Sequence, residues 1–210
     1  MASKPSFGGS LSIQSLIDRE IGCNPELKNG ASAYVSIIAE FAASKDSALF
    51  LERLLDQAGS TYRAAGQSGA QLYTFSDRGV SFLFDMVRQR AVLIWATSRL
   101  VPANSRDNNY HAGYPSAGTN RDKGHAISHA QGGFEGGPNY FPQARRLNQS
   151  RSANGKLWRA IERHFSANPG ESAFVRLIYA SGNDGDVPDE VEYLLLPMTG
   201  QYRAVIFPNS

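Results

Sequence analysis

The N-terminal third of the chain carries apolar residues at helical spacing. Over 11–21, 31–43 and 48–65, apolar side chains recur every three or four positions, which predicts three amphipathic helices. Gly66 then interrupts the pattern, as glycine does where a helix gives way to a turn. We therefore expect residues 1–70 to form a helical N-terminal region, whose function the sequence does not declare.

From Leu72 onward the pattern changes to short runs rich in β-forming residues. Residues 91–98 (AVLIWATS) predict a buried strand, and 81–88 fit either a strand or a short helix. Three more strand candidates end the chain, at 173–180, 191–196 and 202–207. Helices followed by strands predict an α+β protein with a mixed, mainly antiparallel sheet.

The middle of the chain separates these two patterns. Residues 102–137 are rich in Gly, Asn, Pro and Ser and predict a long loop. A loop of that length inside a folded domain is usually functional, so candidate chemistry is sought there first. Residues 139–142 fit a short strand, and a helix is expected within 144–165.

Charge is distributed unevenly although the net charge is only +2. Residues 99–165 hold ten Lys and Arg against four Asp and Glu, whereas 166–210 hold two against six. A basic middle segment favours binding of a polyanion, because neutralised phosphates release counterions. A solvated surface of uneven charge explains the same numbers, so charge alone assigns no function.

Several classes of protein are excluded by composition. The single cysteine, Cys23, allows neither an internal disulfide framework nor a thiolate zinc cluster. No apolar run approaches the roughly 18 residues needed to span a bilayer, so we expect no membrane partner. Residues 1–10 contain no apolar segment of the kind found in a secretory signal peptide, and delivery by a signal-independent route stays open.

The loop and the helix after it contain the residue types that phosphodiester hydrolysis requires. His125 follows Gly124, and a neutral histidine can take a proton from water near neutral pH. Asn148 lies at the start of the basic helical segment, and an amide oxygen can anchor a hydrated Mg²⁺ ion. Nearby Arg and Lys residues can bind the flanking phosphates.

These residues also form a series of motifs with a recognisable order. The series consists of Asp122-Lys123-Gly124-His125, Asn139-x-x-Pro142-Gln143, Leu147-Asn148, Trp158 and Glu162. It resembles the DNA/RNA non-specific endonuclease family of the ββα-metal (His-Me finger) nuclease superfamily. The resemblance implies a ββα-metal nuclease domain within residues 71–210, with its specific motifs confined to 121–162.

The resemblance implies a role for each matching position. His125 would be the general base that activates water, and Asn148 would bind the catalytic Mg²⁺ or a similar ion such as Mn²⁺. Glu162 would lie beside the metal and its waters as a second catalytic residue. Asn139 would tie the loop to the helix, and Asp122 would shape the loop.

Other residues are candidates for the surroundings of this site. His129, four residues after the proposed base, is expected to be structural or a neighbour of the site. Four basic residues are candidate phosphate ligands: Lys123, Arg145, Arg146 and Arg151. Arg106 is a further contender for the arginine beside the scissile phosphate.

The sequence departs from the family pattern in two places. Lys123 stands where the family usually has arginine, and lysine cannot form a bidentate contact with phosphate. Asn148 and Glu162 are fourteen residues apart, so the chain must loop out between Gln149 and Gly155 to bring them together. Asn154 has the helical spacing to Glu162 and is therefore a rival metal ligand.

Zinc chemistry is a separate alternative. His125 and His129 have the spacing of a helical zinc site, but Ala126 occupies the position where zinc hydrolases carry glutamate. His111 and His164 belong to none of the motifs, although His164 fits a broader His-Asn-His arrangement of metal ligands.

The sequence thus predicts a metal-dependent endonuclease that cuts DNA, RNA or both with little sequence specificity. The family resemblance implies a biological role as a bacterial toxin effector that is paired with a dedicated inhibitor protein. The alternative is a nucleic-acid-binding module of the same fold without catalytic activity.

Overall fold

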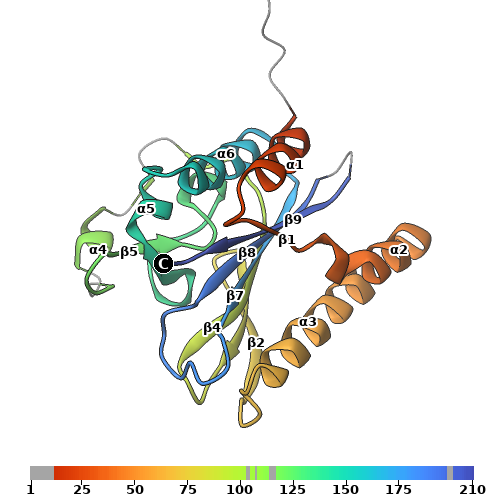
Figure 1. Ribbon diagram of the computed structural model, residues 1–210, viewed down its shortest axis with the longest axis horizontal. Helices are drawn as coiled ribbons and strands as arrows, with labels where there is room; N and C mark the ends of the chain where they lie inside the picture. Colours follow the sequence, from red (N-terminus) through yellow and green to blue (C-terminus); the bar gives the residue numbers. More distant parts are fainter. Residues whose placement is uncertain (1–11, 103–104, 107, 114–116, 198–200) are drawn as a thin grey trace, which may run out of the picture.

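An antiparallel sheet of seven strands forms the centre of the protein (Figure 1). The structure is a computed structural model that describes residues 12–102, 105–106, 108–113, 117–197 and 201–210. The N-terminal segment in which the sequence lacks a signal peptide pattern lies outside these residues. Among the described helices, none has the length and apolarity needed to cross a membrane.

The strands of the central sheet follow the order β1-β9-β8-β7-β4-β3-β2. Their bounds are β1 Lys28–Asn29, β2 Leu72–Asp77, β3 Val80–Asp85, β4 Arg90–Thr97, β7 Ser172–Ile178, β8 Glu190–Leu196 and β9 Arg203–Pro208. Every pairing between described strands is antiparallel. The expected α+β class with a mainly antiparallel sheet is therefore confirmed, whereas the expected parallel component of a mixed sheet is not found among these strands.

The N-terminal region forms the three predicted helices. They are α1 (Ile13–Cys23), α2 (Val35–Ser44, preceded by the 3₁₀ turn η1, Ala31–Tyr34) and α3 (Ser47–Ala64). Asp46 begins α3 by accepting hydrogen bonds from the backbone N–H groups of Ala48 and Leu49, the usual role of an N-cap aspartate. β1 joins the sheet beside β9, so this region shares the sheet with the rest of the chain.

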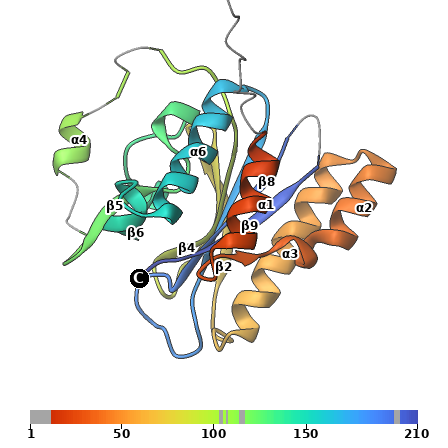
Figure 2. The same ribbon diagram turned by 45° about the horizontal axis from the view of Figure 1, so that its top comes forward.

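Helices cover both faces of the sheet, as Figure 2 shows. α2 and α3 lie against one face, where Phe50 packs edge-on against Phe174 of β7. The opposite face carries α6 (Ala153–Ala167), whose Trp158 packs against Tyr193 and Phe207. Buried side chains from both layers belong to one hydrophobic core.

A two-stranded unit lies outside the central sheet, on the α6 side (Figure 2). It pairs β5 (Arg121–His125) with β6 (Tyr140–Ala144), and the chain then enters α5 (Arg145–Asn148) and α6. The short helix α4 (Asn108–Gly113) precedes it. The order from β5 onward is strand, strand, helix.

Several predicted elements differ from the observed ones. The strand β2 was not predicted, because its residues are mostly exposed on both faces and show no alternation of buried and exposed positions. Residues 81–88 contain the strand β3 rather than a helix. The predicted loop 102–137 contains the short helix α4 as well as the strand β5, whose polar and glycine-rich composition hides its strand character. The helix expected within 144–165 is divided into α5 and α6 by a turn at 149–152.

Candidate functional site

Tight packing within the β5–β6 unit fixes the position of His125. The strand pairing sets Gly124 opposite Phe141 and His125 opposite Tyr140. A Cβ atom on Gly124 would lie 2.3 Å from Oε1 and 2.4 Å from Cβ of Gln143, so only glycine fits there. The glycine lets β5 lie against the buried Gln143, and β5 ends one residue later, at His125.

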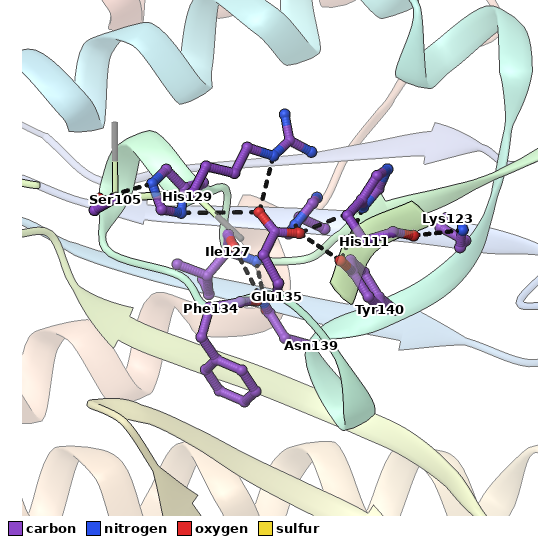
Figure 3. Close-up of polar contacts among 11 residues, drawn as sticks. Ser105, His111, Lys123, Ile127, His129, Phe134, Glu135, Asn139 and Tyr140 are labelled. Carbon is purple, nitrogen blue, oxygen red and sulfur yellow. Dashed lines mark hydrogen bonds and ion pairs between the residues drawn. The ribbon is translucent and has the colours of Figure 1, made fainter. Parts of the chain in front are cut away.

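Asn139 holds together the loop that follows His125. Its side chain is fully buried, and its Oδ1 accepts a hydrogen bond of 3.0 Å from the backbone N–H of Ile127. Its Nδ2 donates to the carbonyl oxygens of Ile127 and Phe134, both at 2.9 Å. The sequence predicted that Asn139 ties this loop to the helix, but these three bonds all run to the loop backbone (Figure 3).

The loop places Glu135 at the centre of a polar cluster (Figure 3). Its Oε2 lies 2.8 Å from Nε2 of His125 and 3.3 Å from Nδ1 of His111, and it also accepts a hydrogen bond from the Tyr140 hydroxyl. Its Oε1 accepts a hydrogen bond of 2.9 Å from Nε of Arg106. We call these five residues the Glu135 cluster.

Two of the expected site residues lie at the edge of this cluster. Nδ1 of His129 lies 3.8 Å from Glu135, and its Nε2 lies 3.1 Å from Oγ of Ser105. Nζ of Lys123 donates a hydrogen bond of 2.6 Å to the carbonyl oxygen of His111. Lys123 thereby ties β5 to α4, and the His111 ring stacks on His125 with a centroid distance of 5.7 Å.

Burial determines the protonation of the His125–Glu135 pair. Burial lowers the pKa of His125 to about 4, because it disfavours the imidazolium more than the Glu135 carboxylate favours it. Burial also acts to raise the pKa of Glu135, but hydrogen bonds from Tyr140 and His125 and the charge of Arg106 hold that pKa below its usual value. His125 is thus neutral beside a carboxylate that only accepts hydrogen bonds. Its Nε2 must carry the proton, which leaves Nδ1 as the basic nitrogen.

Asp122 fixes the orientation of Asn148. Its Oδ2 accepts hydrogen bonds of 3.0 Å from Nδ2 of Asn148 and 2.7 Å from Gln149, while its Oδ1 pairs with Arg145 at 3.0 Å. Because a carboxylate only accepts, the amide must turn its NH₂ group toward Asp122. Within the described residues, Oδ1 of Asn148 accepts no hydrogen bond, so this oxygen is available to a ligand.

Glu162 lies on α6, almost completely buried at 7% exposure. Burial raises the pKa of its carboxyl group, against the opposing charge of Arg159 and a hydrogen bond from Trp158. Its Oε1 accepts a hydrogen bond of 3.1 Å from Nε1 of Trp158, and its Oε2 forms an ion pair of 2.8 Å with Arg159. That ion pair lacks hydrogen-bond geometry, so the buried Oε2 retains unused capacity to accept.

A cavity of about 860 Å³, here called the basic cavity, joins these groups. His125, Asn148, Asp122 and Glu162 all line it, as does His129. Its lining also includes six basic side chains: Arg106, Arg121, Lys123, Arg145, Arg159 and Arg163. The excess of cations over carboxylates gives the cavity the positive potential that an anionic ligand requires.

Three candidates lie elsewhere. Arg146 donates a hydrogen bond of 2.7 Å to the carbonyl oxygen of Ser210, and neither it nor Arg151 belongs to the lining of the basic cavity. Asn154, the rival metal ligand, uses both of its amide atoms in hydrogen bonds to Asn24 and Glu26 of the N-terminal region. Of the two asparagines, the structure therefore brings only Asn148 to the cavity.

The sequence did not identify all members of the site. Glu135 and Tyr140 were not predicted, and His111 was set aside because it belongs to no motif. Arg159 and Arg163 were counted in the basic segment but were not singled out. Helical spacing carried a usable signal for Arg159, which lies three residues before Glu162 on the same helix, but not for Arg163, which directly follows Glu162. For Glu135 and His111, which meet His125 through loop conformation, no local signal exists.

Comparison with known proteins adds no assignment. The chain matches no protein-family model and no curated protein.

Proposed function

We propose that this protein is a metal-dependent endonuclease that hydrolyses phosphodiester bonds in DNA, RNA or both. One observation carries the proposal: a neutral histidine and an asparagine with a free amide oxygen line the same basic cavity. The succession β5, β6, α5 and α6, in which α5 carries Asn148, supports membership of the ββα-metal superfamily, which the motifs around His125 already suggested.

His125 acts as the general base in this proposal. The hydrogen bond between its Nε2 and Glu135 holds the tautomer whose Nδ1 lone pair can accept a proton from water. Glu135 is thus a positioning residue, since it orients the ring without contacting the substrate. The lowered pKa of His125 keeps the base unprotonated throughout the neutral range.

The residues near Asn148 fit a hard divalent cation. The amide oxygen that Asp122 leaves free and the buried carboxylate of Glu162 are the oxygen donors that Mg²⁺ or Mn²⁺ prefers. Such an ion, when bound, supplies positive charge to the phosphoryl and leaving oxygens. Asn148 would hold it directly, and Glu162 would provide a second oxygen acceptor in the same cavity.

The basic side chains of the cavity bind the phosphate backbone. Arg145 reaches the cavity while paired with Asp122, whereas the exposed guanidinium of Arg163 has no side-chain hydrogen bond within the described residues. Contacts to phosphate carry no base information, so cleavage is expected to show little sequence specificity. A protein inhibitor of this site, which the family resemblance implies for a toxin effector, would need an acidic surface that enters the cavity.

The decisive experiment compares three proteins on plasmid DNA and on structured RNA, with Mg²⁺ and with EDTA. The wild type should cleave at least one polymer with Mg²⁺ and stop when EDTA is added. His125→Ala should lose about 10²–10⁴-fold in rate while it still binds the polymer. His164→Ala is the matched control, because His164 also pairs with a glutamate, Glu171, but lies outside the cavity lining.

Two results would contradict the proposal. Equal cleavage by the wild type and His125→Ala, purified in parallel, would assign the activity to a contaminant or to another residue. Binding without cleavage under any divalent ion would make the protein a nucleic-acid-binding module that has the same fold and no catalytic activity.

A further inference from the structure

Three metal-binding side chains from separate elements converge in the Glu135 cluster. His111 comes from α4, His125 from the end of β5, and Glu135 from the loop between the two strands. One donor atom from each lies within 4.8 Å of the other two. Glu135 lies 3.3 Å from Nδ1 of His111 and 2.8 Å from Nε2 of His125 (Figure 3).

From this geometry we infer that His111, His125 and Glu135 form a binding site for a transition-metal ion of the zinc type. The metal site itself does not depend on the proposed function. Only its expected effect on catalysis rests on that proposal. Two imidazoles and a carboxylate are a ligand set that zinc accepts, whereas Mg²⁺ prefers oxygen donors alone. The site is thus distinct from the proposed Mg²⁺ position at Asn148.

The separations between the donors suit such an ion. Ligands bonded to a tetrahedral zinc ion at about 2.0–2.1 Å lie about 3.3 Å from one another. The observed separations of 3.3 and 2.8 Å from Glu135 are close to this value, and the two histidine nitrogens, which lie within 4.8 Å of each other, would close on the ion by side-chain rotation. Three protein ligands would leave a fourth position for water or for a substrate oxygen.

Neighbouring groups already orient the shared carboxylate. Arg106 holds Oε1 of Glu135 at 2.9 Å, which leaves Oε2 directed toward the two histidines. The hydroxyl of Tyr140 donates to the same carboxylate and lies 2.8 Å from Nδ1 of His111. Partners of this kind fix the orientation of metal ligands and raise metal affinity.

Occupation of this site would inhibit the proposed nuclease. A neutral imidazole has one lone pair and one N–H proton. If Nε2 of His125 donates its lone pair to zinc, the proton must reside on Nδ1, which can then no longer accept a proton from water. Zinc and Mg²⁺ are therefore expected to have opposite effects on the same active site.

Direct binding measurements test the site without relying on cleavage. Calorimetric titration of the metal-free full chain with ZnCl₂ should show one bound ion per chain, and Co²⁺ should give the absorption bands of a tetrahedral site. His111→Gln should weaken zinc binding at least about tenfold. His164→Gln should bind zinc like the wild type, because the pair that it disrupts, His164–Glu171 at 2.7 Å, lies outside the cluster.

Glu135→Gln is the second test variant, and circular dichroism of both variants verifies that each is folded. If both folded variants bind zinc as tightly as the wild type, the ion lies elsewhere and the inference is wrong. Absence of zinc binding by the wild type overturns it as well.

A cleavage assay then separates this inference from the proposed function. With Mg²⁺ present, zinc should inhibit the wild type, and inhibition of His111→Gln, relative to its own uninhibited rate, should need at least about tenfold more zinc. A chain that binds zinc through the cluster but never cleaves supports the site and contradicts the nuclease proposal. A chain that cleaves but neither binds zinc nor is inhibited by it supports the nuclease proposal and contradicts the zinc site.

Discussion

Two buried glutamates in this protein have similar partners but different surroundings. Glu192 and Glu135 each accept hydrogen bonds from one tyrosine hydroxyl and one arginine Nε atom. Around Glu192, which lies on β8, these partners are Tyr34 and Arg176. The side chain of Arg176 is 15% exposed, so this ion pair is closed beneath the helices on one face of the sheet.

Around Glu135 the same kinds of group open onto a cavity. The arginine is Arg106, whose side chain is 43% exposed, and the tyrosine is Tyr140. Two histidines, His111 and His125, complete the cluster. The carboxylate of Glu135 is also buried, yet its partners can reach solvent and ligands.

The difference between the two clusters teaches how burial separates structural from chemical roles. A closed ion pair lies out of reach of a ligand, even where an acceptor such as Oε1 of Glu192 receives no hydrogen bond, so its removal should lower the stability of the protein. An open cluster with an unprotonated imidazole can bind a ligand and can transfer protons, so its removal should lower the activity of the protein. Four experiments test this distinction.

Glu192→Gln should produce the largest effect, and it should be an effect on stability. The substitution leaves the charge of Arg176 buried without a counterion, which costs about 3–5 kcal/mol of unfolding free energy. Urea denaturation measures this loss. Glu190→Gln is the control, because its ion pair with Lys28 is exposed and should contribute less than about 1 kcal/mol. Equal stability of the two variants would mean that the closed cluster is dispensable.

Glu135→Gln should reduce cleavage about 10–100-fold with a smaller loss of stability, because the amide no longer orients His125 as a charged acceptor does. Initial rates with saturating Mg²⁺ measure the effect, and the circular dichroism spectrum verifies the fold. If cleavage is unchanged while the protein unfolds as readily as Glu192→Gln, Glu135 is a structural residue like its counterpart.

Another buried carboxylate, that of Asp85, should make the stability of the protein depend on pH in the acid range. Burial acts to raise its pKa, but hydrogen bonds from Tyr62 and from the backbone N–H groups of Val87 and Arg88 hold that pKa below the ordinary 3.8. The stabilisation is complete above pH 3.8 and is lost as the pH falls through the lower pKa of the folded protein. In urea denaturation at decreasing pH, the free energy of unfolding should fall less steeply for Asp85→Asn than for the wild type. Parallel curves for variant and wild type would contradict the assignment.

The smallest effect should distinguish two exposed arginines. Arg163 lines the basic cavity and Arg151 does not, and neither guanidinium has a hydrogen bond within the described part of the chain. Arg163→Ala should weaken polymer binding a few-fold and reduce the slope of log K against log salt by about 1. Arg151→Ala should leave both unchanged, as fluorescence anisotropy can measure. The reverse result would place the phosphate path outside the cavity.

Burial also explains which helices and strands the sequence predicted and which it missed. The three N-terminal helices and the strands β4, β7, β8 and β9 were predicted because each presents a regular apolar pattern to the core. β2 was missed because its exposed faces impose no such pattern. β5 was missed because its conformation depends on pairing with β6 and on the packing of Gly124 against Gln143.

The sequence by itself determined the three N-terminal helices, the helical character of 144–165 and the α+β class, and it singled out the motif residues from Asp122 to Glu162, because these depend on local spacing and residue type. Only the tertiary structure decided that Asn148 rather than Asn154 reaches the cavity, and that Glu135 and His111 meet His125. The physical reason is that loop residues meet through chain reversals and shared burial. Those depend on the whole fold and leave no periodic trace in the sequence.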